Sequence, residues 1–156
     1  MGYRNTAIYD AQGNACYKTW VLASYANLKT GRLSRIPRET QAALQFPPRL
    51  DMSYGPRKIV LPDTPLIPLE PIRVQRNDID YNNHVNNAQY IRMALELLPE
   101  EFEVGGLRVE YRKAVMPGSI ISPSILFTSD AAYVVLAVEE AVCCVIEFTS
   151  RSRVSS

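Results

Sequence analysis

Four side chains with acid–base or hydrogen-bonding chemistry follow one another at every second position between residues 78 and 84. They are two carboxylates, an amide and the only imidazole of the chain, in the order Asp78, Asp80, Asn82 and His84. In an extended segment, side chains two residues apart leave the backbone on the same face. We therefore expect one face of this segment to carry a row of acid, acid, amide and imidazole.

A helical pattern follows directly after this row. Apolar residues recur at three- and four-residue steps from position 85 to position 98, and Pro99 stops the pattern. Asn86 or Asn87 can cap the start of this helix, because a short side-chain oxygen accepts from the free backbone N–H groups of the first turn. The polar row is therefore expected to end at a helix N-terminus.

This combination suits acyl-transfer chemistry. The N–H donors at a helix N-terminus stabilise the oxyanion that develops when water or a carboxylate attacks a carbonyl. His84 can exchange a proton near neutral pH, while Asp80 can orient it, activate water or attack directly. Asp78 and Glu110 are candidate supporting carboxylates.

A purely structural interpretation stands beside the chemical one. Runs rich in Asp and Asn usually form turns and caps, with side chains that bond their own backbone. A histidine that precedes a helix is more often a structural group than a catalyst. Spacing alone favours this structural interpretation.

The composition is that of a globular protein. The 156 residues are 47% apolar and 21% charged, with a net charge of +1, which allows one ordinary domain or one small domain with a substantial attachment. No run approaches the roughly 20 apolar residues that span a bilayer, and no charge pattern is typical of nucleic-acid binding. We therefore expect neither a membrane nor a nucleic acid as a partner.

The cysteines and the single histidine limit the redox and metal chemistry. Cys16, Cys143 and Cys144 make no disulfide framework, so reduced, buried thiols in a cytoplasmic protein are the simplest interpretation. One histidine without a Cys-x-x-Cys pair argues against a zinc site, although the Asp and Asn cluster could hold a hard cation weakly. We expect no cofactor and no resident metal.

The first part of the chain predicts a hairpin and a connector. Residues 3–9 and 15–27 are expected to form two strands, and residues 38–46 a short helix. Seven of the eleven prolines fall between Pro47 and Pro71, too many for regular structure. This stretch is therefore expected to be an extended connector between two units.

The second part predicts one long helix and an antiparallel sheet. A short strand at 72–75 precedes the polar row and its helix. Four strand-like runs follow, near 105–116, 119–129, 131–139 and 142–150. A long central helix wrapped by a curled antiparallel sheet is an α+β arrangement, the hot-dog fold.

Two stretches of this second part carry a resemblance to a known family. RVQRNDIDYNNHVNNAQYIRMALELLP, followed by LRVEYRKAVMPGS, resembles the carboxy-terminal half of the acyl-acyl carrier protein thioesterases, especially the bacterial branch. The earlier stretch GYRNTAIYDAQGNACYKTWVLASYANLKTGRLSRIP is similar to the end of the first hot-dog domain of that family. The segment RKIVLP resembles its interdomain connector.

The resemblance implies hydrolysis of a fatty acyl thioester on acyl carrier protein, a step of fatty acid biosynthesis. By match to the motif, it implies that Asp80, Asn82 and His84 are catalytic, with Asp80 as either nucleophile or base. A fourth position, a Glu in the plant members, falls on Ala114 here, and the Cys beside it falls on Val115. A mechanism that needs that Glu is in doubt, so Asp80 is expected to bear more of the chemistry.

The resemblance also implies three parts. Residues 1–46 are expected to be a remnant of a first hot-dog domain, residues 47–71 the connector, and residues 72–156 the second hot-dog domain with the catalytic motif. Family members have a long stretch before the equivalent of Gly2, so we expect a member truncated at its amino terminus. Its acyl pocket would be open or absent, and its exposed sheet edges would favour self-association.

Two alternatives remain open at this point. The motif also resembles single hot-dog thioesterases that act on acyl-CoA and assemble as dimers or tetramers. A non-catalytic fragment that binds an acyl group or a carrier protein is the other alternative, from a different functional class.

Overall fold

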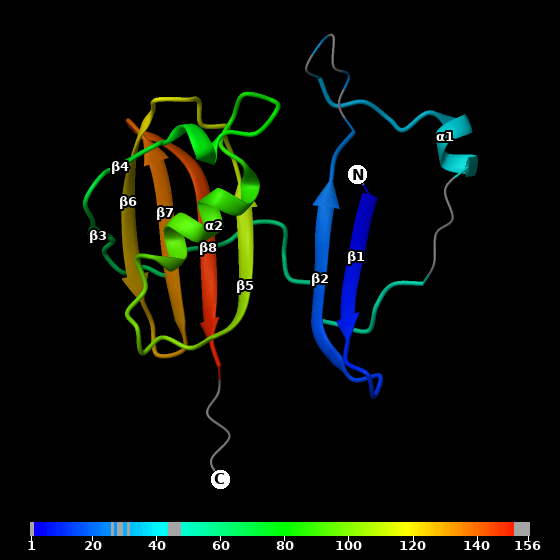
Figure 1. Cartoon of the computed structure of the whole chain (residues 1–156), viewed down its shortest axis with the longest axis horizontal. Helices are drawn as coiled ribbons and strands as arrows, with labels where there is room; N and C mark the ends of the chain where they lie inside the picture. Colours follow the sequence, from blue (N-terminus) through cyan, green and yellow to red (C-terminus); the bar gives the residue numbers. More distant parts are fainter. Residues whose placement is uncertain (1, 26, 28–29, 31, 44–47, 152–156) are drawn as a thin grey trace. The chain divides into compact units, whose positions relative to one another are not determined.

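The chain divides into two compact units, Met1–Arg57 and Lys58–Ser156, in a computed structural model (Figure 1). The structure describes residues 2–25, 27, 30, 32–43 and 48–151.

The first unit is built on a hairpin of strands β1 (Gly2–Tyr9) and β2 (Ala15–Ala23), which pair antiparallel. The carboxylate of Asp10 accepts hydrogen bonds from the backbone N–H groups of Gln12 and Asn14, and Gly13 adopts a φ of 86°. Gly supplies this left-handed conformation at little cost, so the turn chemistry fixes the hairpin. Both predicted strands are present, although the second ends at Ala23.

Helix α1 (Arg38–Ala43) follows where a helix over residues 38–46 was predicted. Residues 44–46 of that prediction lie outside the described residues.

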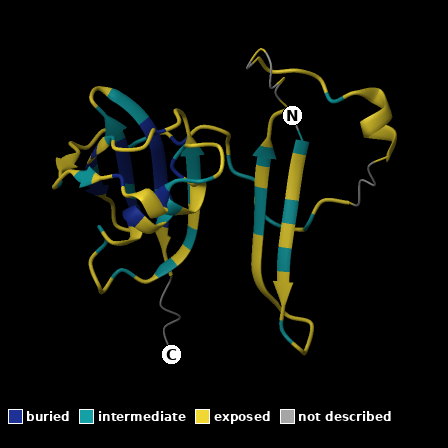
Figure 2. Cartoon of the chain, turned by 45° about the horizontal axis from the view of Figure 1, so that its top comes forward, coloured by how far each residue is buried: buried dark blue, intermediate teal, exposed yellow. Residues whose placement is uncertain are grey.

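One face of the hairpin carries an aromatic cluster. The rings of Tyr3, Trp20 and Tyr54 lie 5.6 to 6.0 Å apart, and the guanidinium of Arg49 lies 4.4 Å from the centre of the Tyr3 ring. Within the described part of this unit, however, no residue is buried (Figure 2). The buried core of the described chain therefore lies in the second unit.

The second unit is an antiparallel sheet with a helix across one face (Figure 1). The strand order is β3-β6-β7-β8-β5, and β4 also pairs with β6. The strands are β3 (Ile67–Pro68), β4 (Ile72–Arg73), β5 (Val104–Tyr111), β6 (Ile120–Phe127), β7 (Ala131–Val138) and β8 (Ala141–Ser150). The α+β arrangement of a helix on an antiparallel sheet is confirmed.

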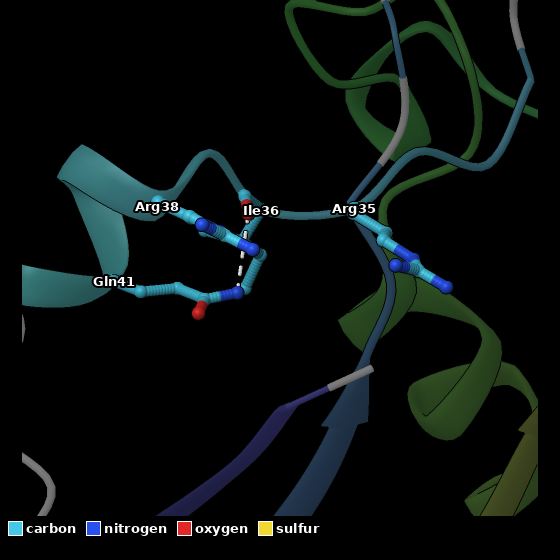
Figure 3. Close-up of a pocket in the computed structure, with 4 residues that line it drawn as sticks. All are labelled: Arg35, Ile36, Arg38 and Gln41. Carbon is cyan, nitrogen blue, oxygen red and sulfur yellow. Dashed lines mark hydrogen bonds between the residues drawn. The ribbon is translucent and has the colours of Figure 1, made fainter.

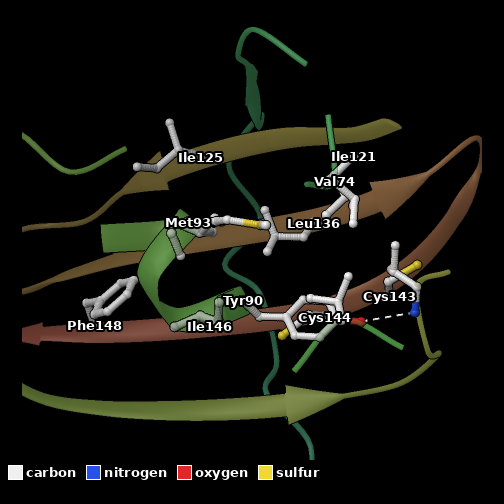
Figure 4. Close-up of a cluster of buried hydrophobic side chains, with 14 of the residues drawn as sticks. Val74, Tyr90, Met93, Ile121, Ile125, Leu136, Cys143, Cys144, Ile146 and Phe148 are labelled. Carbon is white, nitrogen blue, oxygen red and sulfur yellow. Dashed lines mark hydrogen bonds between the residues drawn. The ribbon is translucent and has the colours of Figure 1, made fainter. Parts of the chain in front are cut away.

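Helix α2 (Asn87–Leu95) packs the main core against this sheet. Tyr90 and Met93 are each 2% exposed and lie over Leu136, Ile146 and Phe148, which are fully buried (Figure 4). Burial of side chains of this size removes the apolar surface that drives folding. The N-terminal end of α2 is thereby fixed over the sheet.

The other face of the sheet has a smaller core. Ile59 packs there against Val135 and Val145, and its backbone N–H donates to Glu110 Oε2 at 3.0 Å. Part of the proline-rich stretch is thus held on the second unit by burial and by a side-chain hydrogen bond.

Helix α2 is shorter than the apolar pattern predicted. Val85 is paired with Ile79 in an isolated bridge, so the helix begins only after Asn86. At the other end, Leu97 and Leu98 donate to carbonyls three residues back, which is a tighter turn than an α-helix. Proline disfavours helical geometry in the residue before it, so Pro99 accounts for this end.

Within the described ranges, neither the length nor the apolar character of any helix is sufficient for a membrane crossing.

Candidate active site

The segment that carries the polar residues is a folded loop, so the prediction of one extended row is wrong. A short 3₁₀ helix, Arg76–Asp78, leads into the loop, and Ile79 then pairs with Val85. The Asp80 N–H donates to the His84 carbonyl at 2.8 Å, and the Asn83 N–H donates to the Asp80 carbonyl at 3.0 Å. The chain therefore reverses direction between Asp80 and His84.

The Asp80 side chain is the reason for this reversal. Its Oδ1 accepts the backbone N–H of Asn82 at 2.8 Å and that of His84 at 3.4 Å. Asn83 lies in the left-handed region with a φ of 63°, which asparagine tolerates better than most residues. Alternating polar residues had suggested a strand, but side-chain bonds to the backbone formed a turn instead.

The same bonds favour the ionised form of Asp80. Desolvation of this carboxyl raises its pKa, but the N–H groups of His84 and Asn82 and the Asn82 amide lower it more. The pKa of Asp80 therefore lies below its ordinary value of 3.8. At neutral pH the group is a carboxylate.

Asn82 and His84 flank this carboxylate. The Asn82 amide is exposed and donates to Asp80 Oδ2 at a long 3.4 Å. His84 is half-buried, and its imidazole makes no hydrogen bond to any part of the chain that the structure describes. The loop joins the side chains of Asp80 and Asn82 by this bond, and His84 joins them through its backbone N–H and through its electrostatic effect on the Asp80 carboxyl.

The hairpin of the first unit contains the same turn. Asp10 bonds the N–H groups of Gln12 and Asn14 through Oδ1, and the amide of Asn14 through Oδ2. Gly13 takes the left-handed position that Asn83 takes in the loop. The turn geometry of Asp80 is therefore no evidence of catalysis by itself, and function must be argued from its surroundings.

Asp78 forms the base of the loop. It is 1% exposed and is the only buried charged side chain among the described residues. Its Oδ2 accepts the N–H of Gln75 at 2.7 Å, and its Oδ1 accepts Arg92 Nη2 at 3.0 Å. The Asp78 carbonyl accepts the N–H of Asn86 at 2.8 Å.

The two candidate asparagines at the helix start have different roles. Asn86 is the N-cap, and its side chain accepts the N–H of Ala88 at 2.9 Å. Asn87 is the first helical residue, and its carbonyl accepts the Tyr111 hydroxyl at 3.0 Å. Desolvation, together with Cys144 and Tyr90, raises the pKa of Tyr111 to about 12, so its hydroxyl keeps its proton.

The segment after β5 runs beside the loop. Val115 accepts the N–H of Val85 at 2.9 Å and donates its own N–H to the Tyr90 hydroxyl at 3.0 Å. Ala114 precedes it and is exposed. Ala114 is the position at which the resemblance expects a Glu. It lies next to Val115, which contacts the loop, but it carries no carboxylate.

The structure does not bring Glu110 to the loop. Glu110 bonds Ile59 and Arg112, on the sheet face opposite to α2. The Arg112 guanidinium lowers the pKa of Glu110 below its ordinary value of 4.5, against the effect of desolvation.

Sequence reasoning missed Arg92 and the hydroxyl of Tyr90. A signal for Arg92 was present, because a buried carboxylate needs a cation and Arg92 is the only Lys or Arg between residues 87 and 98. No comparable signal existed for the bond from Val115 to Tyr90, since it joins a backbone group to a side chain 25 residues away.

No three His, Cys, Asp or Glu side chains in the described ranges come together as a metal ligand set. A surface hollow of about 340 Å³ lies in the first unit, lined by Arg35, Ile36, Arg38 and Gln41 (Figure 3). The Gln41 amide in this hollow donates to the Ile36 carbonyl at 3.1 Å. None of the loop residues lines it.

Comparison with known proteins identifies the second unit. The model of the acyl-ACP thioesterase C-terminal domain, in which ACP is acyl carrier protein, matches residues 68–142. Through this segment, the second unit is similar to the C-terminal domain of the acyl-ACP thioesterases. The matched residues include the whole loop, helix α2 and the segment around Val115.

Solved structures described as thioesterases share the fold of this chain. A Lactobacillus plantarum structure, provisionally described as an oleoyl thioesterase, is 28% identical with a TM-score of 0.70 and is matched over 96% of this chain and 62% of its own. An acyl-ACP thioesterase from Bacteroides thetaiotaomicron VPI-5482 is 20% identical with a TM-score of 0.74, over 96% of this chain and 62% of its own. The predicted hot-dog fold is confirmed.

A plant structure completes the comparison. The 12:0-ACP thioesterase from Umbellularia californica is 19% identical with a TM-score of 0.70, over 96% of this chain and 60% of its own. The chain thus spans less than two thirds of the length of these structures. No curated protein sequence matches the chain significantly.

Proposed function

We propose that the chain is a thioester hydrolase that releases a fatty acid from acyl carrier protein. The observation that carries the proposal is the loop of residues 78–86, which presents Asp80, Asn82 and His84 at the start of α2 inside the segment matched by the family. Phosphopantetheine carries the acyl group on such a substrate, so the substrate presents a thioester.

The proposed reaction uses the atoms that the turn leaves available. Because Asp80 Oδ1 already accepts two backbone N–H groups, Oδ2 is the atom that would accept a proton from water or attack the carbonyl carbon itself. A C–O bond forms as the carbonyl oxygen becomes an oxyanion, and the dipole at the start of α2 stabilises that charge. The C–S bond then breaks, and the departing thiolate takes up a proton.

His84 and Asn82 complete the proposed site. The imidazole would pass the proton to the leaving sulfur, and the Asn82 amide would hold the attacking group beside Oδ2. Where Asp80 attacks directly, water later cleaves the acyl anhydride and restores the carboxylate, and the proton released from that water returns to the imidazole in place of the one given to the sulfur. The products are the same in both routes, a free fatty acid and a carrier-protein thiol.

The domain division and partners are part of the same proposal. Residues 1–46 would correspond to the last strands of a first hot-dog domain, residues 47–71 to the connector, and residues 72–156 to the second hot-dog domain. A carrier-protein substrate would place the reaction in the cytoplasm, within fatty acid biosynthesis. Self-association would proceed through the exposed edges of the hot-dog sheets.

The test is thiol release from acyl-ACP and from acyl-CoA of equal chain length, with Asp80→Asn and Asp10→Asn as a matched pair. Both asparagines keep a side-chain oxygen for the turn, but only Asp80→Asn removes the proposed catalytic charge. We expect Asp80→Asn to lower turnover of acyl-ACP by about 100-fold or more. Asp10→Asn should leave turnover unchanged.

Other outcomes separate the alternatives. Turnover of acyl-CoA alone would indicate the acyl-CoA class of thioesterase. Binding of carrier protein without any thiol release by well-folded chain would indicate a binding module. Equal turnover in Asp80→Asn and the unsubstituted chain would show that Asp80 stabilises the turn but takes no part in catalysis.

A further inference from the structure

The Asp78 carboxylate is the part of the loop that the proposed chemistry does not use. It is almost completely buried, and its two oxygens are divided between the loop entrance at Gln75 and the helix at Arg92. A buried carboxylate without a cation is strongly unfavourable, so the ion pair with Arg92 offsets the cost of burying Asp78.

The Arg92 side chain is itself held in place. Its Nε donates to Gln89 Oε1 at 2.6 Å while Nη2 donates to Asp78 at 3.0 Å. Gln89 and Arg92 are three residues apart on α2, which places them on one side of the helix. The guanidinium therefore connects the second turn of α2 to the base of the loop.

The base of the loop is continuous with the proposed site. Asn86 donates to the Asp78 carbonyl, Ile79 pairs with Val85, and Asp80 donates to the His84 carbonyl. These three links join consecutive residue pairs of the two segments that form the loop. We therefore expect a displacement of Asp78 to move Asp80 and His84, two residues further along the paired segments.

We infer that Arg92 is a positioning residue, which acts through Asp78 to hold the loop that carries Asp80 and His84 over the start of α2. The role in turnover rests on the proposed function, whereas the effect on the loop does not. A purely structural role would lower stability but leave the loop of the folded protein unchanged.

The single histidine makes the loop directly observable. In the full chain, the Cε1–H of His84 gives one proton NMR signal, and its shift and width report the surroundings of the imidazole. We expect Arg92→Met to shift and broaden this signal at a temperature at which the helix and sheet amide signals match those of the unsubstituted protein. Arg73→Met is the matched control, because Arg73 lies exposed on β4 and bonds neither Asp78 nor the loop through its side chain.

Kinetics give the second measurement. Because small misplacements of a catalytic group cost one to two orders of magnitude, we expect Arg92→Met to lower kcat about 10- to 100-fold with KM within about twofold. Asp78→Asn with Arg92→Met should lower kcat no further than either substitution alone, since the two side chains act through one bond. If Arg92→Met does not fold, Gln89→Met is the substitute variant. It removes the acceptor of Arg92 Nε and so displaces the guanidinium less severely.

The results separate the two proposals. An unchanged His84 signal in folded Arg92→Met, or in Gln89→Met if that is the variant that folds, would overturn the positioning role. A changed signal in a protein without thioesterase turnover would uphold the role in the loop and overturn the proposed function instead.

Discussion

Tyr90 is the side chain through which helix α2 holds the segment after β5. Its hydroxyl accepts the buried N–H of Val115, and the carbonyl of Val115 accepts the N–H of Val85 in the loop. Tyr111 makes a superficially similar bond, but its acceptor is the carbonyl of Asn87, at an exposed position. The two hydroxyls are therefore expected to contribute unequally to stability.

Tyr90→Phe leaves the Val115 N–H buried without an acceptor. We expect the free energy of unfolding to fall by about 1–3 kcal/mol. Tyr111→Phe should cost less than about 0.5 kcal/mol, because water can replace the lost donor. Urea unfolding of both variants checks the difference, and equal losses would show that Val115 finds another acceptor or that water reaches it.

At the scale of elements, the start of α2 is defined by one residue. The side chain of Asn86 accepts the N–H of Ala88, whereas the side chain of Asn87 lies exposed in the first turn. The sequence offered both asparagines as caps, and only the bridge between Ile79 and Val85 decides between them, because it fixes where the loop ends.

We expect Asn86→Ala to lower stability by about 1 kcal/mol, the usual cost of a lost N-cap. Asn87→Ala should have little effect, since alanine is a good helix former and no cap is lost. Thermal unfolding of the pair is the measurement. A larger loss in Asn87→Ala would mean that the cap lies one residue further along.

The elements that sequence predicted are those set by local periodicity and turn residues. The strands from β5 to β8 follow alternation and the turn at Gly118, which has a φ of 75°. The extended row was wrong, whereas the structural interpretation of turns and caps, with side chains that bond their own backbone, was confirmed. Alternation alone cannot distinguish the two. The pair of Asp78 and Arg92 joins residues 14 apart, so periodicity could not show it, and the only signal was that Arg92 is the single Lys or Arg between residues 87 and 98.

At the scale of the whole molecule, the two units differ in how their hydrogen bonds are protected. The described part of the first unit has no buried residue, whereas β7 and β8 in the second unit are largely buried. A two-stranded hairpin is marginal by itself. Its backbone hydrogen bonds should therefore open without unfolding of the second unit.

Hydrogen exchange tests this difference. We expect the amides of β1 and β2 to exchange at least about 100-fold faster than those of β7 and β8, because local opening of a marginal element costs little free energy. Slow exchange in the hairpin would contradict this expectation. Protection that grows with protein concentration would show that another copy covers it.

The packing of Ile59 has a consequence for the design of hybrid enzymes. Ile59 lies only 5% exposed against Val135 and Val145, and it is tied to Glu110 by its backbone. A chimera joined at residue 72 would lack Ile59. Val135 and Val145 would then lose the side chain that packs on them, and the Glu110 carboxylate would lose one of its hydrogen-bond donors. A junction before Lys58 would transfer the sheet together with Ile59, which packs on it. This position is therefore the better one for exchanging the preceding N-terminal segments between relatives.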